Sequence, residues 1–422
     1  MTRRRPILLI VALLGGGCPS GAAAQESQEP TALAAEVQRL RAELDQVRRE
    51  YDERLAALEA RIVALSAGTS PARADAGSPP AHVSPGAPAS LPPMGQTPGP
   101  AASKVFNPDI AVVGNMLGAA GTNPIESSPA LEFDEAEASF QAIVDPYARG
   151  DVFFAFGPEG VEVEEGFITF SSLPGGLLLE AGKLRGAFGK VNTMHTHALP
   201  WIDRPLVTRT LVGGSEGISD AGLSVSKLIP NPALFLEATG EIFRGQSEVF
   251  AGSERSHVSY VGRLRGYRDL TEGTNLDVGG SFAWGHTDAE PEATRRLIGI
   301  DATFRYRPLR RAIYRRMIAR SELVWSQDRL AASRPTSFGM YASTEYQFAR
   351  RWFAGARYDY AERPLTPSLA DRGAAAILTF WPSEYSQIRG QYRHTRYAED
   401  VRANELLVQF LFSIGAHGGH VF

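Results

Sequence analysis

Hydrophobic and polar residues alternate in short segments over the C-terminal three quarters of the chain, and turn residues separate these segments. In one of them, Ile298 and Ile300 fall on one face, whereas Asp301 and Arg305 fall on the other. A side-chain period of two is typical of a β-strand with two unlike faces. The pattern predicts sixteen strands, near 108–118, 131–144, 146–156, 161–172, 176–186, 218–229, 232–244, 256–268, 274–287, 294–307, 316–328, 338–349, 352–361, 372–381, 385–397 and 403–414.

The predicted strands are those of a membrane barrel rather than those of a water-soluble sandwich. Many reach ten residues or more, and the polar face of several is rich in arginine. A soluble sandwich has apolar inner faces, whereas an outer-membrane barrel combines long strands with a polar interior. The predicted fold class is therefore an all-β transmembrane barrel of about 16 antiparallel strands over residues 105–422, preceded by an N-terminal α-helical coiled coil.

The connections between the predicted strands alternate in length. In outer-membrane barrels the short turns are periplasmic and the long loops are external. An even number of strands returns the C-terminus to the periplasmic side, where the N-terminal coil would also lie. The short turns are 145–146, 173–176, 229–232, 350–351 and 381–384, and the longer loops are 119–130, 187–217, 245–255, 288–293, 329–337 and 362–371.

Residues 1–24 have the features of a signal peptide. Arg3, Arg4 and Arg5 precede a short apolar stretch, and Ala22-Ala23-Ala24 fits the small-residue rule for cleavage. A lipoprotein anchored at Cys18 is the alternative. Cys18 is the only cysteine of the 422 residues, so cleavage after position 24 leaves a chain without thiols, which suits an oxidising compartment.

Residues 25–65 read as a periplasmic coiled coil. Val37, Leu40, Leu44 and Val47 follow one another at spacings of three and four, and the same pattern continues to Leu65. Such a narrow heptad seam favours self-association, and the alternative is a single amphipathic helix on another surface. Residues 66–104 are a Pro/Ala/Gly-rich linker, a composition that cannot bury a core.

Residues 187–217 form the longest predicted loop, and it carries apolar and aromatic side chains. Phe188, Met194, Trp201 and Ile202 are poor choices for a loop that is free in solvent. A sixteen-strand lumen is wide enough to be aqueous, and an inward-folded loop would narrow it. We expect this loop to constrict the pore, with an external cap or a subunit contact as the alternative.

Charge is distributed unevenly along the chain. The chain carries 43 basic and 47 acidic residues, a balance that excludes a general nucleic-acid binder as well as nucleic acid as a partner. Within the barrel, the second half is rich in arginine. Arginines at mid-strand positions favour weak anion preference, and the competing expectation from the acidic total is cation preference. The predicted pore-lining residues are Lys190, Arg204, Arg209, Arg263, Arg265, Arg305, Arg307, Arg320, Arg357, Arg389, Arg393, Glu162 and Glu164.

Two histidine pairs are candidate metal ligands. His195 and His197 form H-x-H in the long loop, and His417 and His420 form H-x-x-H near the C-terminus. Imidazole pairs can hold Zn²⁺ or Ni²⁺, and structural hydrogen bonding is the alternative role. The sequence has no G-x-S-x-G, H-E-x-x-H or P-loop motif, so we expect neither an enzyme nor a cofactor.

Four segments resemble a family of outer-membrane proteins described as porin-like or as zinc-regulated TonB-dependent outer membrane receptors. They are NPDIAVVGN (107–115), VDPYARGDVFFAFGPEG (144–160), LRGAFGKVNTMHTHALPWIDRP (184–205) and SIGAHGGHVF (413–422). The resemblance implies an outer-membrane barrel. Any metal traffic that it implies would depend on His195, His197, His417 and His420.

The sequence therefore predicts a porin of the cell outer membrane that passes small hydrophilic solutes, anions among them, by passive diffusion. One alternative is an outer-membrane metal (zinc) uptake receptor or channel, and another is a structural envelope tether that acts through the coiled coil. Predicted partners are outer-membrane lipid, further copies in a homotrimer, peptidoglycan, and the outer-membrane assembly machinery, which would read the terminal Phe422.

Overall fold

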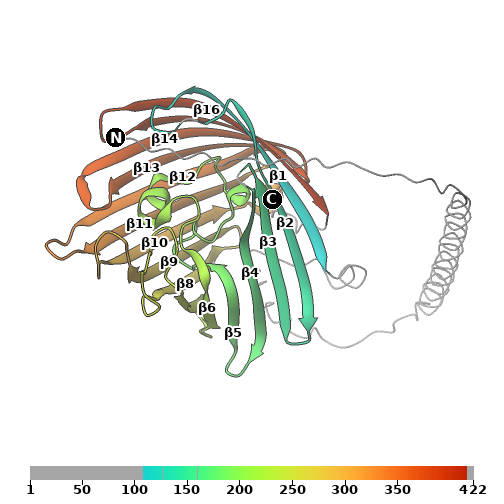
Figure 1. Ribbon diagram of the computed structural model, residues 1–422. Coiled ribbons are helices and arrows are strands. Elements are labelled where there is room, and N and C mark those ends of the chain that lie inside the picture. The colour runs from blue at the N-terminus through green and yellow to red at the C-terminus, as the bar shows by residue number, and fades with distance from the viewer. Residues whose placement is uncertain (1–107, 127, 159, 416–422) are drawn as a thin grey trace, which may run out of the picture. The chain divides into compact units, whose positions relative to one another are not determined.

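The computed structural model describes residues 108–126, 128–158 and 160–415. Sixteen antiparallel strands form a closed barrel in which each strand pairs with its neighbours in the chain, and β1 pairs with β16 (Figure 1). The strands are β1 (Asp109–Thr122), β2 (Leu131–Asp145), β3 (Ala148–Gly157), β4 (Gly160–Leu173), β5 (Leu177–Arg185), β6 (Ser219–Leu228), β7 (Phe235–Phe243), β8 (Ser259–Thr271), β9 (Thr274–His286), β10 (Thr294–Tyr306), β11 (Arg316–Arg329), β12 (Thr336–Ala349), β13 (Trp352–Arg363), β14 (Thr366–Ser383), β15 (Ser386–Arg396) and β16 (Arg402–Gly415).

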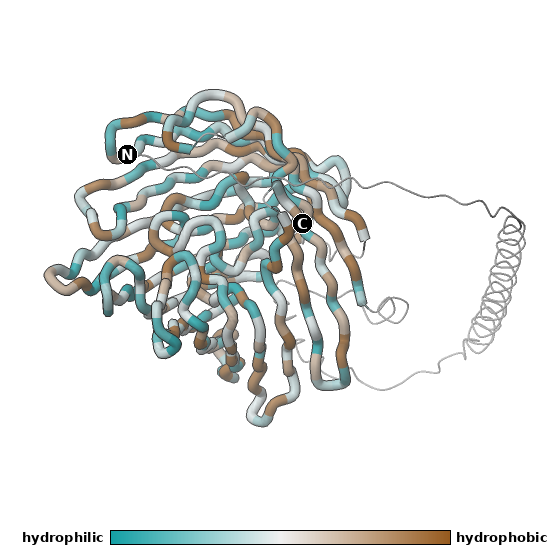
Figure 2. The backbone as a smooth tube through the Cα atoms, viewed as in Figure 1, coloured by the Kyte–Doolittle hydropathy of each residue, from teal (hydrophilic) through white to brown (hydrophobic). Residues whose placement is uncertain are grey.

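The alternation of hydrophobic and polar residues corresponds to the two faces of the barrel wall, as the tube in Figure 2 shows along the strands. Ile298 and Ile300 on β10 are 42% and 46% exposed, whereas Asp301, which follows Ile300 directly, is only 2% exposed. An apolar outer surface with polar groups inside is the arrangement of a barrel that stands in lipid. The predicted sixteen-strand antiparallel barrel is confirmed.

One predicted loop is wrong. Residues 362–371 were expected to form a long connection, but β13 and β14 continue as a hairpin with only Pro364 and Leu365 between them. Glu362 pairs with Ala370 and Arg363 with Thr366, so residues 367–369 bulge out of the ladder. A bulge tolerates a proline that lacks a backbone N–H, and for this reason Pro367 does not end the strand.

The strict alternation of short and long connections is also wrong. We use the name turn rim for the end of the barrel where β2 meets β3, and the name loop rim for the opposite end. The connection 307–315 lies at the turn rim, yet it has room for the short 3₁₀ helix η3 (Leu309–Arg311). At the loop rim, β3 ends at Gly157 and β4 already begins at Gly160, so this connection is short.

The apolar core lies inside the barrel, where residues 186–218, here named the pore loop, fold into the lumen between β5 and β6 (Figure 1). The pore loop contains the 3₁₀ helix η1 (Thr196–Ala198) and the π-helical turn η2 (Thr208–Gly213). Its buried apolar side chains include Phe188, Val191, Leu199, Trp201, Val207, Leu211, Val212 and Ile218. The composition of the loop predicted this inward fold.

Glycines on the wall make room for the pore loop. A Cβ atom on Gly339 of β12 would lie 2.7 Å from Val207 and 3.1 Å from Leu211. Beside Gly339, the rings of Trp201 and Tyr341 meet edge to face with centroids 5.0 Å apart. The pore loop therefore packs directly against the strand backbone.

Several predicted features lie outside the residues that the structure describes. They are the signal peptide 1–24 with Cys18, the coiled coil 25–65, the linker 66–104, the pair His417 and His420, and the terminal Phe422. No helix within the described ranges is both long enough and apolar enough to span a membrane.

Candidate functional site

An arginine-rich clamp holds the middle of the pore loop. Arg357 on β13 places Nη2 2.9 Å from both carboxylate oxygens of Asp203 and donates from Nη1 to the Asp203 carbonyl at 2.8 Å. Arg393 on β15 donates to the same carboxylate at 2.8 Å. Burial alone would raise the pKa of Asp203, but the two guanidinium groups hold it well below its usual range. Asp203 is therefore an ionised anchor for the loop.

The same arginines also contact acidic groups of the wall. Arg357 donates to Asp359 at 2.7 Å, and Arg393 donates to Glu405 at 3.0 Å through Nε. Each guanidinium thus lies between a wall carboxylate and the loop carboxylate of Asp203. Charge-assisted hydrogen bonds of this kind are roughly twice as strong as those between neutral groups. Their main role in this structure is to fix the loop rather than to present free charge.

Backbone carbonyls of the pore loop are bound by further side chains of the wall. Arg389 on β15 donates to the carbonyls of Leu199 and Trp201 at 2.8 and 3.1 Å. Gln391, on the same strand, accepts the backbone N–H of Ile202 at 3.0 Å. A loop without regular hydrogen bonding can be buried because its polar backbone groups find such partners.

The beginning of the pore loop is held on the other side of the lumen. Glu241 on β7 accepts the N–H of Ala187 at 2.7 Å, and Glu322 on β11 accepts that of Val191 at 2.9 Å. Lys190 reaches Asp277 on β9 at 2.7 Å. Burial lowers the pKa of Lys190 to about 8, although Asp277 opposes this shift. The loop is thus anchored around most of the barrel circumference.

His195 joins the pore loop to a group of carboxylates on β2 and β4. Its Nδ1 lies 2.6 Å from Glu164 and 2.8 Å from Glu137, and its Nε2 lies 2.8 Å from Glu165. Burial would lower the pKa of His195, but these carboxylates raise it well above its usual range. The site therefore favours an imidazolium that forms ion pairs with several acids.

The same group has the composition of a cation site. One ligand atom each from His195, Glu137 and Glu164 lie within 4.8 Å of one another. His197 adds Nδ1 at 3.3 Å from Glu137. The sequence pointed to the two histidines but not to their acidic neighbours, which lie on strands that are distant in the chain. The other predicted pair, His417 and His420, lies beyond the described ranges.

The remaining predicted pore-lining residues are spread over the wall and the loop. Arg263 donates to the Gly189 carbonyl and to Asp301, and Arg204 donates to carbonyls within the loop. Arg265 pairs with Asp277 at 2.9 Å, and Arg305 lies 3.8 Å from the same carboxylate.

Four other predicted positions lie near the ends of strands or of the loop. Arg209 pairs with Glu126, and Glu164 pairs with Arg185 at 3.0 Å. Glu162 is exposed and pairs with Lys183 at 3.1 Å, and Arg307 is exposed just beyond β10. Within the described part of the chain, no hydrogen bond or ion pair joins Glu162 or Arg307 to the pore loop.

Two cavities lie at opposite ends of the pore loop. The cavity near the turn rim measures about 160 Å³, and its charged lining consists of Arg316, Arg320, Arg389, Glu345 and Glu384. The cavity near the loop rim measures about 500 Å³, and its charged lining consists of Glu126, Arg209, Glu248 and Asp371. Basic groups outnumber acidic groups in the first cavity, and the reverse holds in the second.

Comparison with known proteins finds a relative of similar sequence. An uncharacterised protein of Aquifex aeolicus (strain VF5) is 30% identical over 337 residues, which cover 68% of this chain and 69% of that protein. No protein-family model matches the chain.

Solved structures share the barrel at low sequence identity. An anion-selective porin from Comamonas acidovorans superposes with a TM-score of 0.54 at 10% identity, covering 72% of this chain and 98% of the porin. OprB of Pseudomonas putida gives 0.50 at 10% identity, covering 73% and 94%. A loop-deletion mutant of OmpT, an outer membrane protein of Vibrio cholerae, gives 0.50 at 11% identity, covering 72% and 98%. The predicted porin-like resemblance is confirmed at the level of the fold.

Proposed function

This chain belongs to the same family as the Aquifex aeolicus protein, and from that premise together with its porin fold we propose that it is a channel of the outer membrane. It would pass small hydrophilic solutes by passive diffusion. The observation that carries the proposal is the pore loop, which folds into a polar lumen and is clamped there through Asp203. An inward-folded loop sets the width of a wide barrel without closing its wall.

Polar cavities on both sides of the pore loop support passage rather than a sealed plug. Each cavity is lined by charged side chains of the wall and by residues of the loop itself. Charged rings at the entrances of a pore concentrate solutes of opposite sign. The basic cavity at the turn rim favours anions, and Arg316 and Arg320 there form no ion pair with a described carboxylate.

The test is single-channel recording in a planar bilayer. The purified full-length chain should give stable open steps in KCl solution whose size is uniform from one insertion to the next. A bilayer that stays silent after verified insertion would contradict a passive channel and would favour a receptor or a structural protein.

We also propose that the channel assembles as a homotrimer with its coil in the periplasm. Support comes from the heptad seam in 25–65 and from a trimeric form of Vibrio cholerae OmpT, whose structure gives a TM-score of 0.50 at 10% identity. Leu40→Asp combined with Leu44→Asp should weaken the oligomer in mild detergent. Three further features stay predictions: contacts with peptidoglycan through the coil, a tethering role, and recognition of Phe422 by the assembly machinery.

Metal uptake is the second candidate function. It is favoured by His195, Glu137 and Glu164, whose ligand atoms converge within the lumen. Under this proposal Zn²⁺ would reduce the conductance of the channel, because a bound cation beside the pore loop changes the charge of the solute path. A His195→Ala variant should lose that response.

A further inference from the structure

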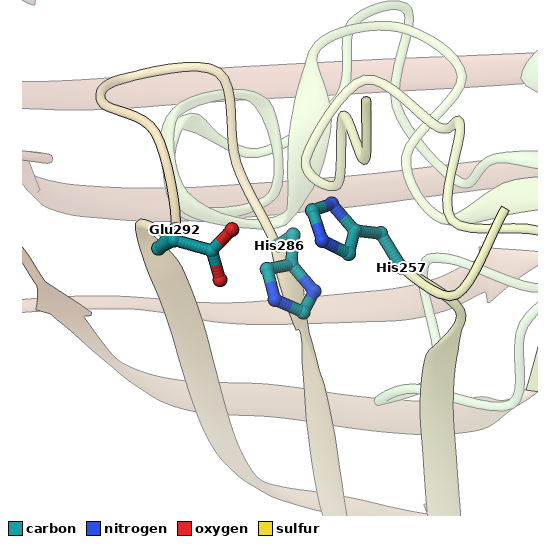
Figure 3. A group of neighbouring side chains, drawn as sticks. All are labelled: His257, His286 and Glu292. Atoms are coloured by element: carbon teal, nitrogen blue, oxygen red, sulfur yellow. The ribbon is translucent and has the colours of Figure 1, made fainter. Parts of the chain in front are cut away.

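Two histidines and one glutamate from three separate segments meet at the loop rim (Figure 3). His257 is the last residue but one of the connection between β7 and β8, His286 is the last residue of β9, and Glu292 lies in the connection that leads to β10. One ligand atom from each lies within 4.8 Å of the others. No sequence motif joins these residues, and none of them takes part in the clamp on the pore loop.

The two imidazole rings are stacked. Their centroids lie 3.8 Å apart with an angle of 8° between the ring planes, and His257 is buried. Nδ1 of His286 is also buried, and it has no hydrogen-bond partner among the residues that the structure describes. Leaving a buried polar atom unpaired is unfavourable. The nitrogen is thus available to a ligand that can accept its lone pair.

Backbone hydrogen bonds hold both histidines in place, and the N–H of His257 donates to the Glu254 carbonyl at 3.0 Å. The carbonyl of His286 accepts the N–H of Ala251 at 2.9 Å. Beneath the site, the ring of Phe250 lies so close to the β9 backbone that a Cβ atom on Gly285 would be 2.6 Å from it. Only glycine permits this approach, so packing of the Phe250 ring against Gly285 fixes the backbone next to His286.

Glu292 completes the group from the exposed side. Its backbone is in the left-handed region with φ of 62°, a conformation that a non-glycine residue rarely adopts. The turn is closed by hydrogen bonds from Ala293 N–H to the Glu290 carbonyl at 3.0 Å and from Thr287 N–H to the Ala293 carbonyl at 2.9 Å. In Figure 3 the Glu292 carboxylate points toward the His286 ring.

We propose that His257, His286 and Glu292 bind a divalent transition-metal ion of the zinc class at the loop rim. Two imidazole nitrogens and one carboxylate oxygen are a donor set that such ions prefer, and a water molecule would take the fourth tetrahedral position. The lone pair of each imidazole nitrogen lies in the plane of its ring, so the two rings would turn out of their parallel stack to form Zn–N bonds of about 2.0–2.1 Å.

The bound ion would fasten the connection 244–258 to the connection 287–293. The first of these connections also touches the pore loop, because Phe250 belongs to the same buried core as Leu211 and Val212. Glu248 accepts the N–H of Glu216 at 3.2 Å. A metal ion at the rim would therefore stabilise the outer support of the pore loop, whether or not the barrel conducts.

The test measures Zn²⁺ binding to the full-length, untagged protein in detergent by titration calorimetry. His195→Ala with His197→Ala serves as the background, so that the lumenal histidines do not contribute. On that background, His257→Ala or His286→Ala should weaken binding at one site by at least the roughly 10–100-fold that loss of an outer-shell partner costs. The matched control is His394→Ala, since His394 is hydrogen-bonded to Asn404 on the wall, and it should leave the isotherm unchanged.

A second readout uses Arg255, which is exposed two residues before His257. Zn²⁺ should slow trypsin cleavage after Arg255 in the wild type but not in His286→Ala. Glu292→Gln, at an exposed position, tests the third ligand without disturbing the packing and should weaken binding. If the His257→Ala/His286→Ala protein binds Zn²⁺ and is cleaved as the wild type is, the proposed site is wrong. If Glu292→Gln gives the wild-type isotherm, Glu292 is not the third ligand.

Discussion

Arg357 binds Asp203 from halfway around the barrel. The pore loop enters between β5 and β6, and Arg357 lies on β13, eight strands away from β5 in a closed ring of sixteen. The contact therefore spans the lumen and fixes the loop across its full width.

Arg357→Ala should destabilise the protein strongly. The Arg357 side chain is 1% exposed, and its loss leaves Asp203 and Asp359 buried beside one another with fewer partners. Removing one partner of a buried ion pair costs about 3–5 kcal/mol. The measurement is urea unfolding of the protein in detergent micelles.

The control for this loss is Arg372→Ala. Arg372 is exposed on β14 and lies over the Tyr360 ring at 5.6 Å. Its removal should change the free energy of unfolding by less than about 1 kcal/mol. Equal losses in the two variants would show that the clamp has no special role.

Gly339→Val should displace the pore loop without removing any polar contact. The added methyl groups would collide with Val207 and Leu211, and overpacking of this kind costs about 1–3 kcal/mol. Gly280→Val is the matched control, because a Cβ atom at Gly280 on β9 meets nothing within 4 Å. We expect greater current noise during openings of Gly339→Val than of Gly280→Val. Equally low noise in the two variants would show that the pore loop does not pack against Gly339.

His195 should make the loop sensitive to alkaline rather than acidic pH. Its raised pKa contributes stability that is fully present below the unfolded value of about 6.5 and is lost as the pH rises through the higher folded value. Channel noise should therefore stay low near neutral pH and rise only in alkaline solution. This alkaline rise in channel noise should be absent from His195→Asn. A rise in noise at about pH 6.5 in the wild type would contradict the ion-pair network.

Anion preference should depend on the basic cavity at the turn rim. Arg316→Ser with Arg320→Ser removes two cations that line it, so the reversal potential across a KCl gradient should shift toward cation selectivity. Arg296→Ser, at an exposed position on β10, should leave the potential unchanged. If the wild type is cation-selective and the double substitution does not change its reversal potential, the acidic cavity at the loop rim determines the selectivity.

The sequence predicted the barrel wall well because strand periodicity is a local property. It failed at 362–371, where Pro364 lies in a two-residue turn and a bulge accommodates Pro367, so that the strands continue through the expected loop. The inward fold of the pore loop was predictable from its apolar residues. Its anchors were not, since Arg357 and Arg393 lie 154 and 190 residues from Asp203 in the chain.

The same limit applies to the candidate cation sites. A motif search finds H-x-H at His195 and His197, but the acids that surround them come from other strands. His257, His286 and Glu292 have no spacing signature at all, and only the closure of the barrel wall brings them together. Contacts between segments that are distant in the chain are set by strand register, which the sequence of any one segment does not contain.

If the pore loop sets the conductance of the channel, deletion of residues 191–212 will change that conductance. The measurement is single-channel conductance in a planar bilayer. The control shortens the connection 330–335, which lies at the loop rim outside the core. We predict that the deletion enlarges the conductance severalfold while the control leaves it unchanged. If the deletion protein inserts and has the conductance of the wild type, the pore loop does not set the conductance of the channel.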